Sequence, residues 1–184
     1  MERALVLIDI QNDYFPGGRN ELAAPEQAAE CAARVLASFR QNGWPVCHIQ
    51  HVSTRSTATF FLPGTPGAEI YGAVAPQGGE AVFVKHAPNA FFETELLQAL
   101  CERRIKDIVV CGMMSHMCVD TSVRAARDHG LQVTLLHDAC ATKDLVWKGK
   151  TIPARDVHAA YMAALDGSFA RVLSTEEFLQ ELTL

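Results

Sequence analysis

Short apolar runs alternate with helix-like segments along most of this chain, and that alternation limits its fold more than any other feature. Residues 4–8 form an uninterrupted apolar run, as expected of a strand buried on both faces. Further strands are predicted at residues 45–51, 81–84, 108–111, 131–136 and 169–173. Helices are predicted from Pro25 to just before Gly43, at about 93–103, 118–129 and 153–165, and after Ser174.

Strands that alternate with helices favour a parallel sheet covered on both faces, and right-handed crossovers make such a sheet doubly wound. We therefore expect one α/β domain over residues 1–184. Its predicted architecture is a six-stranded, mainly parallel sheet in a Rossmann-type arrangement of three layers.

The segment from residue 52 to residue 80 differs from the rest because it is rich in Ser, Thr, Gly and Pro. A loop of this length inside a compact domain is usually functional. The sequence leaves open whether this loop completes the site of a neighbouring subunit.

Charge and composition exclude several classes of function. Sixteen basic and 21 acidic residues give a net charge of -5 without a basic cluster, so nucleic acid is not an expected partner. No apolar stretch approaches the roughly 18 residues of a membrane span, and the amino-terminal residues do not resemble a signal peptide. We expect a cytoplasmic protein with a small-molecule substrate and no membrane partner.

Six cysteines, at positions 31, 47, 101, 111, 118 and 140, include no Cys-x-x-Cys pair. In a reducing cytosol structural disulfides are not expected, and five of the six are interpreted as small buried apolar residues.

Three chemically useful side chains follow predicted strands. Asp9 directly follows the first strand, Lys85 directly follows the third, and Cys118 begins a helix shortly after the fourth. Ligands of open α/β sheets bind outside the carboxyl ends of the strands. A charged residue that closes a strand is as often a solvated boundary, so position alone does not decide the roles of Asp9 and Lys85.

Cys118 has a stronger physical argument. A cysteine near a helix amino terminus lies at the positive end of the helix dipole, which favours the thiolate. On this basis the sequence predicts a thiol pKa below its ordinary value, with Lys85 lowering it further and Asp9 accepting the thiol proton.

Four segments of the chain resemble motifs of the isochorismatase-like hydrolases. They are residues 6–15 (VLIDIQNDYF), 63–70 (PGTPGAEI), 83–91 (FVKHAPNAF) and 110–126 (VCGMMSHMCVDTSVRAA). Each motif alone is modest, but together they occur in the right order at the right strand ends. The resemblance covers about residues 4–173.

The resemblance implies a catalytic triad of Asp9, Lys85 and Cys118. Cys118 would be the nucleophile, Asp9 the general acid and base, and Lys85 the residue that stabilises the thiolate. It also implies a cis peptide bond at Met113-Met114 and an oxyanion hole made by the backbone N–H groups of Met114 and Cys118. Ser115 stands where many relatives carry threonine, which retains the hydroxyl.

The predicted reaction is cleavage of a C–N bond in an amide, carbamoyl compound or lactam through a thioester on Cys118. The segment from Cys111 to Ala141 most resembles uncharacterised members and streptothricin hydrolase-like proteins. Two alternatives remain: vinyl ether hydrolysis of the isochorismatase type, and a thiol redox sensor without turnover. The resemblance also implies a homo-oligomer, either a dimer or a tetramer.

No metal and no other cofactor is expected. Nicotinamidases of this superfamily carry an Asp-x-His metal motif after the second strand, and here His51 and Ser53 occupy those two positions. His48 does not supply a second ligand, because an offset of three residues on a strand directs His48 and His51 to opposite faces. Both histidines are interpreted as polar positions on or beside the strand.

Substrate-binding residues are predicted only from their proximity to the motifs. They are Gln11, Tyr14, Phe61, Phe91 and Trp147. The aromatic residues would wall an apolar pocket beside the thiol, or else belong to the plain core. Gln11 would bond a polar substrate group or shape its loop.

Overall fold

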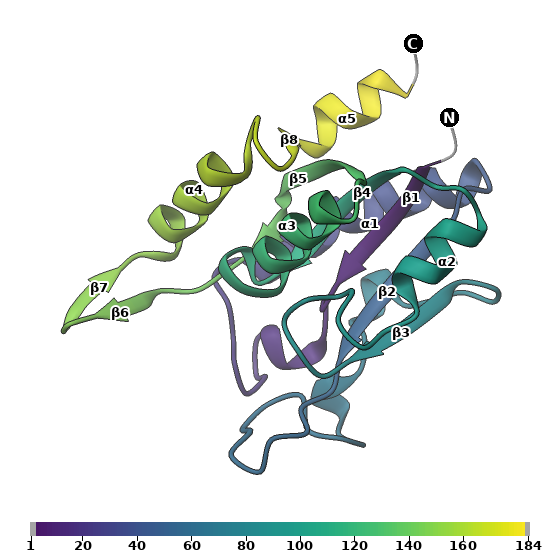
Figure 1. Ribbon diagram of the computed structural model, residues 1–184. Coiled ribbons are helices and arrows are strands. Elements are labelled where there is room, and N and C mark those ends of the chain that lie inside the picture. Colours follow the sequence, from purple (N-terminus) through teal and green to yellow (C-terminus); the bar gives the residue numbers. More distant parts are fainter. Residues whose placement is uncertain (1–2, 183–184) are drawn as a thin grey trace.

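A central sheet of six parallel strands organises the molecule (Figure 1). The computed structural model describes residues 3–182. The strands are β1 (Arg3–Ile8), β2 (Val46–His51), β3 (Ala81–Lys85), β4 (Asp107–Met113), β5 (Gln132–Ala141) and β8 (Arg171–Leu173), in the order β3-β2-β1-β4-β5-β8. Every neighbouring pair is parallel. The prediction of a doubly wound α/β fold is confirmed.

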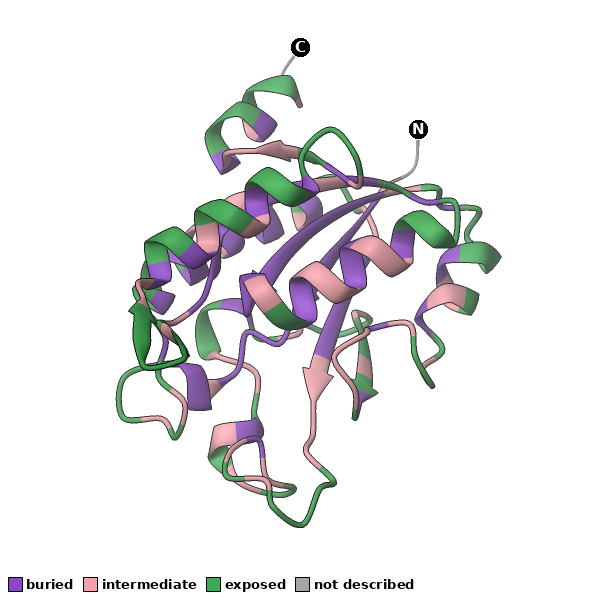
Figure 2. Ribbon diagram, turned by 60° about the vertical axis from the view of Figure 1, so that its left-hand side comes forward, coloured by how far each residue is buried: buried purple, intermediate pink, exposed green. Residues whose placement is uncertain are grey.

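Five helices cover the two faces of this sheet. α1 (Pro25–Gln41) and α5 (Thr175–Glu181) pack on one face, and α2 (Leu96–Glu102), α3 (Asp120–Asp128) and α4 (Ala154–Leu165) pack on the other. Along β1 the side chains alternate, so that Leu5 and Leu7 join the first core while Val6 and Ile8 join the second. Figure 2 shows the result, with buried central strands and helices exposed only on their outer sides.

The carboxyl ends of β1 and β4 meet at the point where the strand order reverses. The chain moves outward from β1 through β2 to β3, and then returns to the other side of β1 with β4. Gly112 in β4 makes the close approach possible, because a Cβ atom there would lie 2.0 Å from the carbonyl oxygen of Ile8. Ligands of open α/β sheets bind at this switch point.

The long loop between β2 and β3 lies at the same edge, toward which the β1 arrow points in Figure 1. As predicted, it forms no long element: its helical turns are η2 (Pro66–Ala68) and η3 (Gly72–Val74). A further 3-10 turn, η1 (Asn12–Tyr14), follows β1 and contacts η2.

Two regions differ from the sequence prediction. The helix expected at 118–129 begins as a π-helical turn, η4 (Ser115–Val119), which runs into α3. The unpredicted strands β6 (Leu145–Trp147) and β7 (Lys150–Ile152) form an antiparallel hairpin that projects from the body of the molecule (Figure 1). Its turn at Lys148 and Gly149 has positive φ at both residues, which suits a tight hairpin.

Within residues 3–182 no helix combines the length and the apolar character that crossing a membrane requires.

Candidate active site

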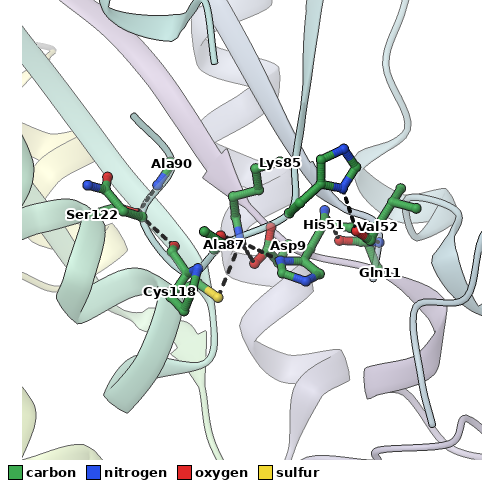
Figure 3. A network of polar contacts seen from close by, with 12 residues as sticks. Asp9, Gln11, His51, Val52, Lys85, Ala87, Ala90, Cys118 and Ser122 are labelled. Atoms are coloured by element: carbon green, nitrogen blue, oxygen red, sulfur yellow. Dashed lines mark hydrogen bonds and ion pairs between the residues drawn. The ribbon is translucent and has the colours of Figure 1, made fainter. Parts of the chain in front are cut away.

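Asp9, Lys85 and Cys118 come together at the carboxyl edge of the sheet (Figure 3). The Lys85 Nζ lies 2.7 Å from Oδ2 of Asp9 and 3.3 Å from Sγ of Cys118. The side chains of Asp9 and Lys85 are completely buried, and Cys118 is buried as well. The three side chains that the sequence singled out therefore form one contact cluster below the surface.

Local backbone geometry presents these groups. Asp9 has a φ of 50°, a left-handed conformation that aspartate tolerates better than most residues. Cys118 lies in the π-helical turn, in which the N–H groups of Met117 and Val119 both donate to the Met114 carbonyl. The Met113-Met114 peptide bond just before this turn is cis.

His51 is a fourth member of the cluster that sequence reasoning missed. Its Nδ1 lies 2.9 Å from Lys85 Nζ, and the Ala87 carbonyl oxygen accepts from the same ammonium at 3.0 Å. Because an ammonium only donates, Nδ1 must be the acceptor and the ring proton resides on Nε2. The position of His51 could have indicated this role, because His51 ends β2 just as Lys85 ends the neighbouring strand β3.

Burial and charge together fix the ionisation of the cluster. Burial lowers the pKa of His51 to about 4, and the charge of Lys85 lowers it too, so the ring is neutral at pH 7. Burial also acts to lower the pKa of Lys85, but the charge of Asp9 and the hydrogen bonds to Asp9 and Cys118 outweigh it, and the lysine pKa is raised. Lys85 is thus a stable cation.

The prediction of a low thiol pKa is wrong in sign. Burial raises the pKa of Cys118 far above its ordinary value, and the charge of Asp9 raises it further against the opposing effect of Lys85. Burial also raises the pKa of Asp9, while the ion pair with Lys85 opposes that shift. The arrangement at rest is a neutral thiol beside a carboxylate paired with an ammonium.

A metal ion does not fit this cluster while Lys85 is in place. Ligand atoms of Asp9, His51 and Cys118 lie within 4.8 Å of one another, a spacing that a metal could use. The ammonium of Lys85, however, contacts all three side chains. A divalent cation bound to these groups would have to lie against an ammonium that already supplies their positive charge.

A cavity of about 310 Å³ opens beside the cluster. Two of the predicted pocket residues, Tyr14 and Phe61, lie in its wall together with Cys118 and His51. Most of the remaining wall comes from the start of the long loop. The loop residues of the lining are Ser53, Thr54, Arg55, Thr57, Ala58, Thr59, Phe60 and Phe61, and the others outside the cluster are Tyr14, His86, Pro88, Met114 and Met117.

Three predicted substrate-binding residues lie elsewhere. Gln11 is fully buried, and its amide bonds the backbone of His51 and Ala68, so it shapes the loop. Phe91 turns away from the cavity and packs near the His129 ring at 5.3 Å. Trp147 is 68% exposed on the β6–β7 hairpin. Proximity to a motif in the sequence does not show which way a side chain points, and for this reason the prediction was wrong for these three residues.

The doubly wound sheet agrees with the fold of known isochorismatase hydrolases. The isochorismatase domain matches residues 3–177, and the chain therefore belongs to the isochorismatase family. It is similar to the uncharacterized isochorismatase family protein YddQ of Bacillus subtilis, with 51% identity over 180 residues that cover 98% of this chain and 100% of the relative.

Solved structures agree with this assignment. A protein of Oleispira antarctica assigned to the isochorismatase hydrolases has a TM-score of 0.93 and 49% identity, over 97% of this chain and 96% of that one.

Two relatives are named for their reactions. A streptothricin hydrolase of Streptomyces noursei is 33% identical over 78% of this chain and 51% of its own length. A maleamate amidohydrolase of Pseudomonas putida is 26% identical over 97% of this chain and 86% of its own length. The family is thus hydrolytic and includes amide hydrolases.

Proposed function

We propose that this protein hydrolyses a C–N bond of a small amide, carbamoyl compound or lactam through a thioester on Cys118. The observation that carries the proposal is the contact of Lys85 with both Asp9 and Cys118, where the thiol borders the cavity. A nucleophile, a carboxylate and a fixed cation within contact distance are the parts that covalent acyl transfer requires.

The first step follows from the neutral thiol. Within residues 3–182, Oδ1 of Asp9 accepts no hydrogen bond, although it is buried. That oxygen is available to take the thiol proton as Sγ attacks the carbonyl carbon. The C–S bond then forms as the proton moves to Asp9, so a free thiolate need not accumulate.

The remaining steps reuse the same groups. Backbone N–H groups of Met114 and Cys118, both in the cavity wall, would stabilise the oxyanion. Protonated Asp9 gives its proton to the departing nitrogen as the C–N bond breaks. It then takes a proton from the attacking water as the new C–O bond forms, and returns that proton to Sγ as the C–S bond breaks, which releases the acid and restores the thiol. Lys85 keeps its charge throughout and holds the carboxylate in place.

The test compares wild-type protein with Cys118→Ala and Asp9→Asn. Each is incubated with primary amides, N-carbamoyl compounds, ureido acids and lactams, and released ammonia or amine is measured. We expect turnover of at least one class by the wild type, and a loss of about a thousandfold or more in both variants. Cys101→Ala, which removes an exposed cysteine, is the matched control and should behave as wild type.

An inert wild type on the whole panel would contradict amide hydrolysis. In that case isochorismatase-type cleavage of a vinyl ether is tested next with isochorismate. Peroxide sensitivity of Cys118 without any turnover would instead support the thiol sensor.

A further inference from the structure

An exposed arginine without an ion-pair partner among residues 3–182 borders the cavity beside Cys118. Arg55 lines the wall, and within residues 3–182 its guanidinium makes no ion pair and no side-chain hydrogen bond. No aspartate or glutamate is among the lining residues. The nearby carboxylate of Asp9 is not available, since it is buried against Lys85.

The rest of the wall does not compete with Arg55 for an anion. Lys85 is not part of the lining, and His51 is neutral. His86 uses its Nδ1 on the Val52 carbonyl at 2.7 Å. Burial and the charge of Lys85 account for most of the lowered pKa of His51, and the charge of Arg55 adds a smaller contribution.

The other lining side chains suit a small ligand with one polar end. Hydroxyl groups of Ser53, Thr54, Thr57 and Thr59 lie on the loop near Arg55, whereas the rings of Tyr14, Phe60 and Phe61 form an apolar wall. A volume of about 310 Å³ is at the lower end of ligand pockets, so the occupant is a small molecule.

We propose that Arg55 binds a carboxylate of the substrate, so that the preferred substrates are small amides that carry a carboxylate, such as half-amides of dicarboxylic acids. The planar guanidinium offers two parallel N–H donors that match the two oxygens of a carboxylate. With the carboxylate held by the loop, the amide carbon of the same molecule lies toward Cys118. The assignment of the amide end rests on the function proposed above.

The experiment measures binding separately from chemistry. Succinamate and succinamide differ in one end only, carboxylate against neutral amide. Their affinities for the Cys118→Ala protein are measured by calorimetry at low salt. We expect succinamate to bind at least about tenfold more tightly, as a charge-assisted pair contributes. Arg55→Gln should remove that difference, and raising the salt should reduce it.

Arg103→Gln is the matched control. It removes the same charge from an exposed position that lines a different cavity, and the preference for succinamate should survive. Melting curves of both variants establish that the fold is intact. Equal affinities of the two ligands, absent binding of succinamate, or a preference that persists in Arg55→Gln would each overturn the proposal.

Hydrolysis of succinamate and succinamide by the wild-type protein is measured in parallel. This measurement tests the proposed amide hydrolysis, not the binding of the carboxylate. Arg55-dependent binding of succinamate without any cleavage leaves the anion site standing and rejects amide hydrolysis. Cleavage of amides by a protein that binds both ligands equally would support amide hydrolysis and reject the anion site at Arg55.

Discussion

Lys85 has three N–H donors but four neighbours. Oδ2 of Asp9, Nδ1 of His51 and the Ala87 carbonyl oxygen lie at 2.7, 2.9 and 3.0 Å, while Sγ of Cys118 lies at 3.3 Å. The three nearer acceptors suffice to use all the donors. The thiol therefore accepts the weakest of the four interactions with the ammonium, which agrees with the raised pKa of Cys118.

The reactivity of Cys118 toward iodoacetamide should follow this raised pKa. Because only the thiolate reacts, we expect slow alkylation at pH 7 and a rise only at alkaline pH. Asp9→Asn removes a charge that raises the thiol pKa, so the profile should move to lower pH. Lys85→Met removes a charge that lowers it, so the profile should move to higher pH.

Mass spectrometry of the Cys118 peptide gives the rate at each pH. Exposed Cys101 serves as an internal check that the reagent is active. Fast modification of wild-type Cys118 at pH 7, or profiles of both variants that coincide with it, would contradict the neutral thiol.

The sequence supports the choice of Asp9, Lys85 and Cys118 because each follows a strand whose end can be located from its apolar run. It does not reveal the thiol pKa, since the burial that dominates this pKa depends on tertiary packing. Aromatic residues are ambiguous for a similar reason. Phe61 and Phe91 both lie close to motifs, yet only Phe61 faces the cavity.

At the scale of the elements, the carboxylate of Glu80 holds the amino-terminal end of β3 in place. Glu80 receives two hydrogen bonds from Arg40 of α1, at 2.7 and 2.9 Å, and contacts Nε2 of His48 in β2 at 2.9 Å. The backbone N–H of Gln77 donates to the same carboxylate. Glu80 therefore joins α1, β2 and the segment that leads into β3.

Glu80→Gln should lower the free energy of unfolding by about 2 kcal/mol at pH 7. The Arg40 hydrogen bonds hold the pKa of Glu80 at about 2, below its ordinary value of 4.5. The stabilisation is thus complete above pH 4.5 and disappears as the pH falls toward 2. Urea unfolding at several pH values measures both the size and the window.

The matched control is Glu176→Gln. Glu176 pairs with Arg34, but both side chains are more than half exposed, so this change should destabilise the protein much less than Glu80→Gln. Equal losses for the two variants, or a Glu80 effect that persists at pH 2, would contradict the argument.

At this scale the sequence predicts regular elements better than short ones. The six main strands and five helices carry clear apolar patterns. β6 and β7 have three residues each and lie largely in solvent, so no burial pattern marks them. The sequence does not reveal the π-helical turn either, because the turn runs directly into α3 and the apolar spacing looks the same in both.

For the whole molecule, we propose a homo-oligomer in which a second copy covers the β6–β7 hairpin. Val146 and Trp147 are 70% and 68% exposed there, and neighbouring large apolar side chains on a surface often mark a contact with another protein chain. Light scattering should give a mass of at least twice 20.1 kDa. The double change of Val146 and Trp147 to serine should lower that mass, and a wild-type mass of one chain would reject the interface.

The wall of the cavity comes mostly from one stretch of the loop after β2, whereas the reacting groups follow strand ends and a turn. The cavity wall and the Asp9–Lys85–Cys118 cluster are therefore encoded in different parts of the chain. Phe61 is buried and its N–H donates to Asp13, whereas Thr54, Arg55, Thr57 and Thr59 are exposed and take no part in the contacts among Asp9, Lys85 and Cys118. Such a division favours the evolution of new substrate ranges by loop exchange, and it makes this segment the natural place to begin redesigning the enzyme's selectivity.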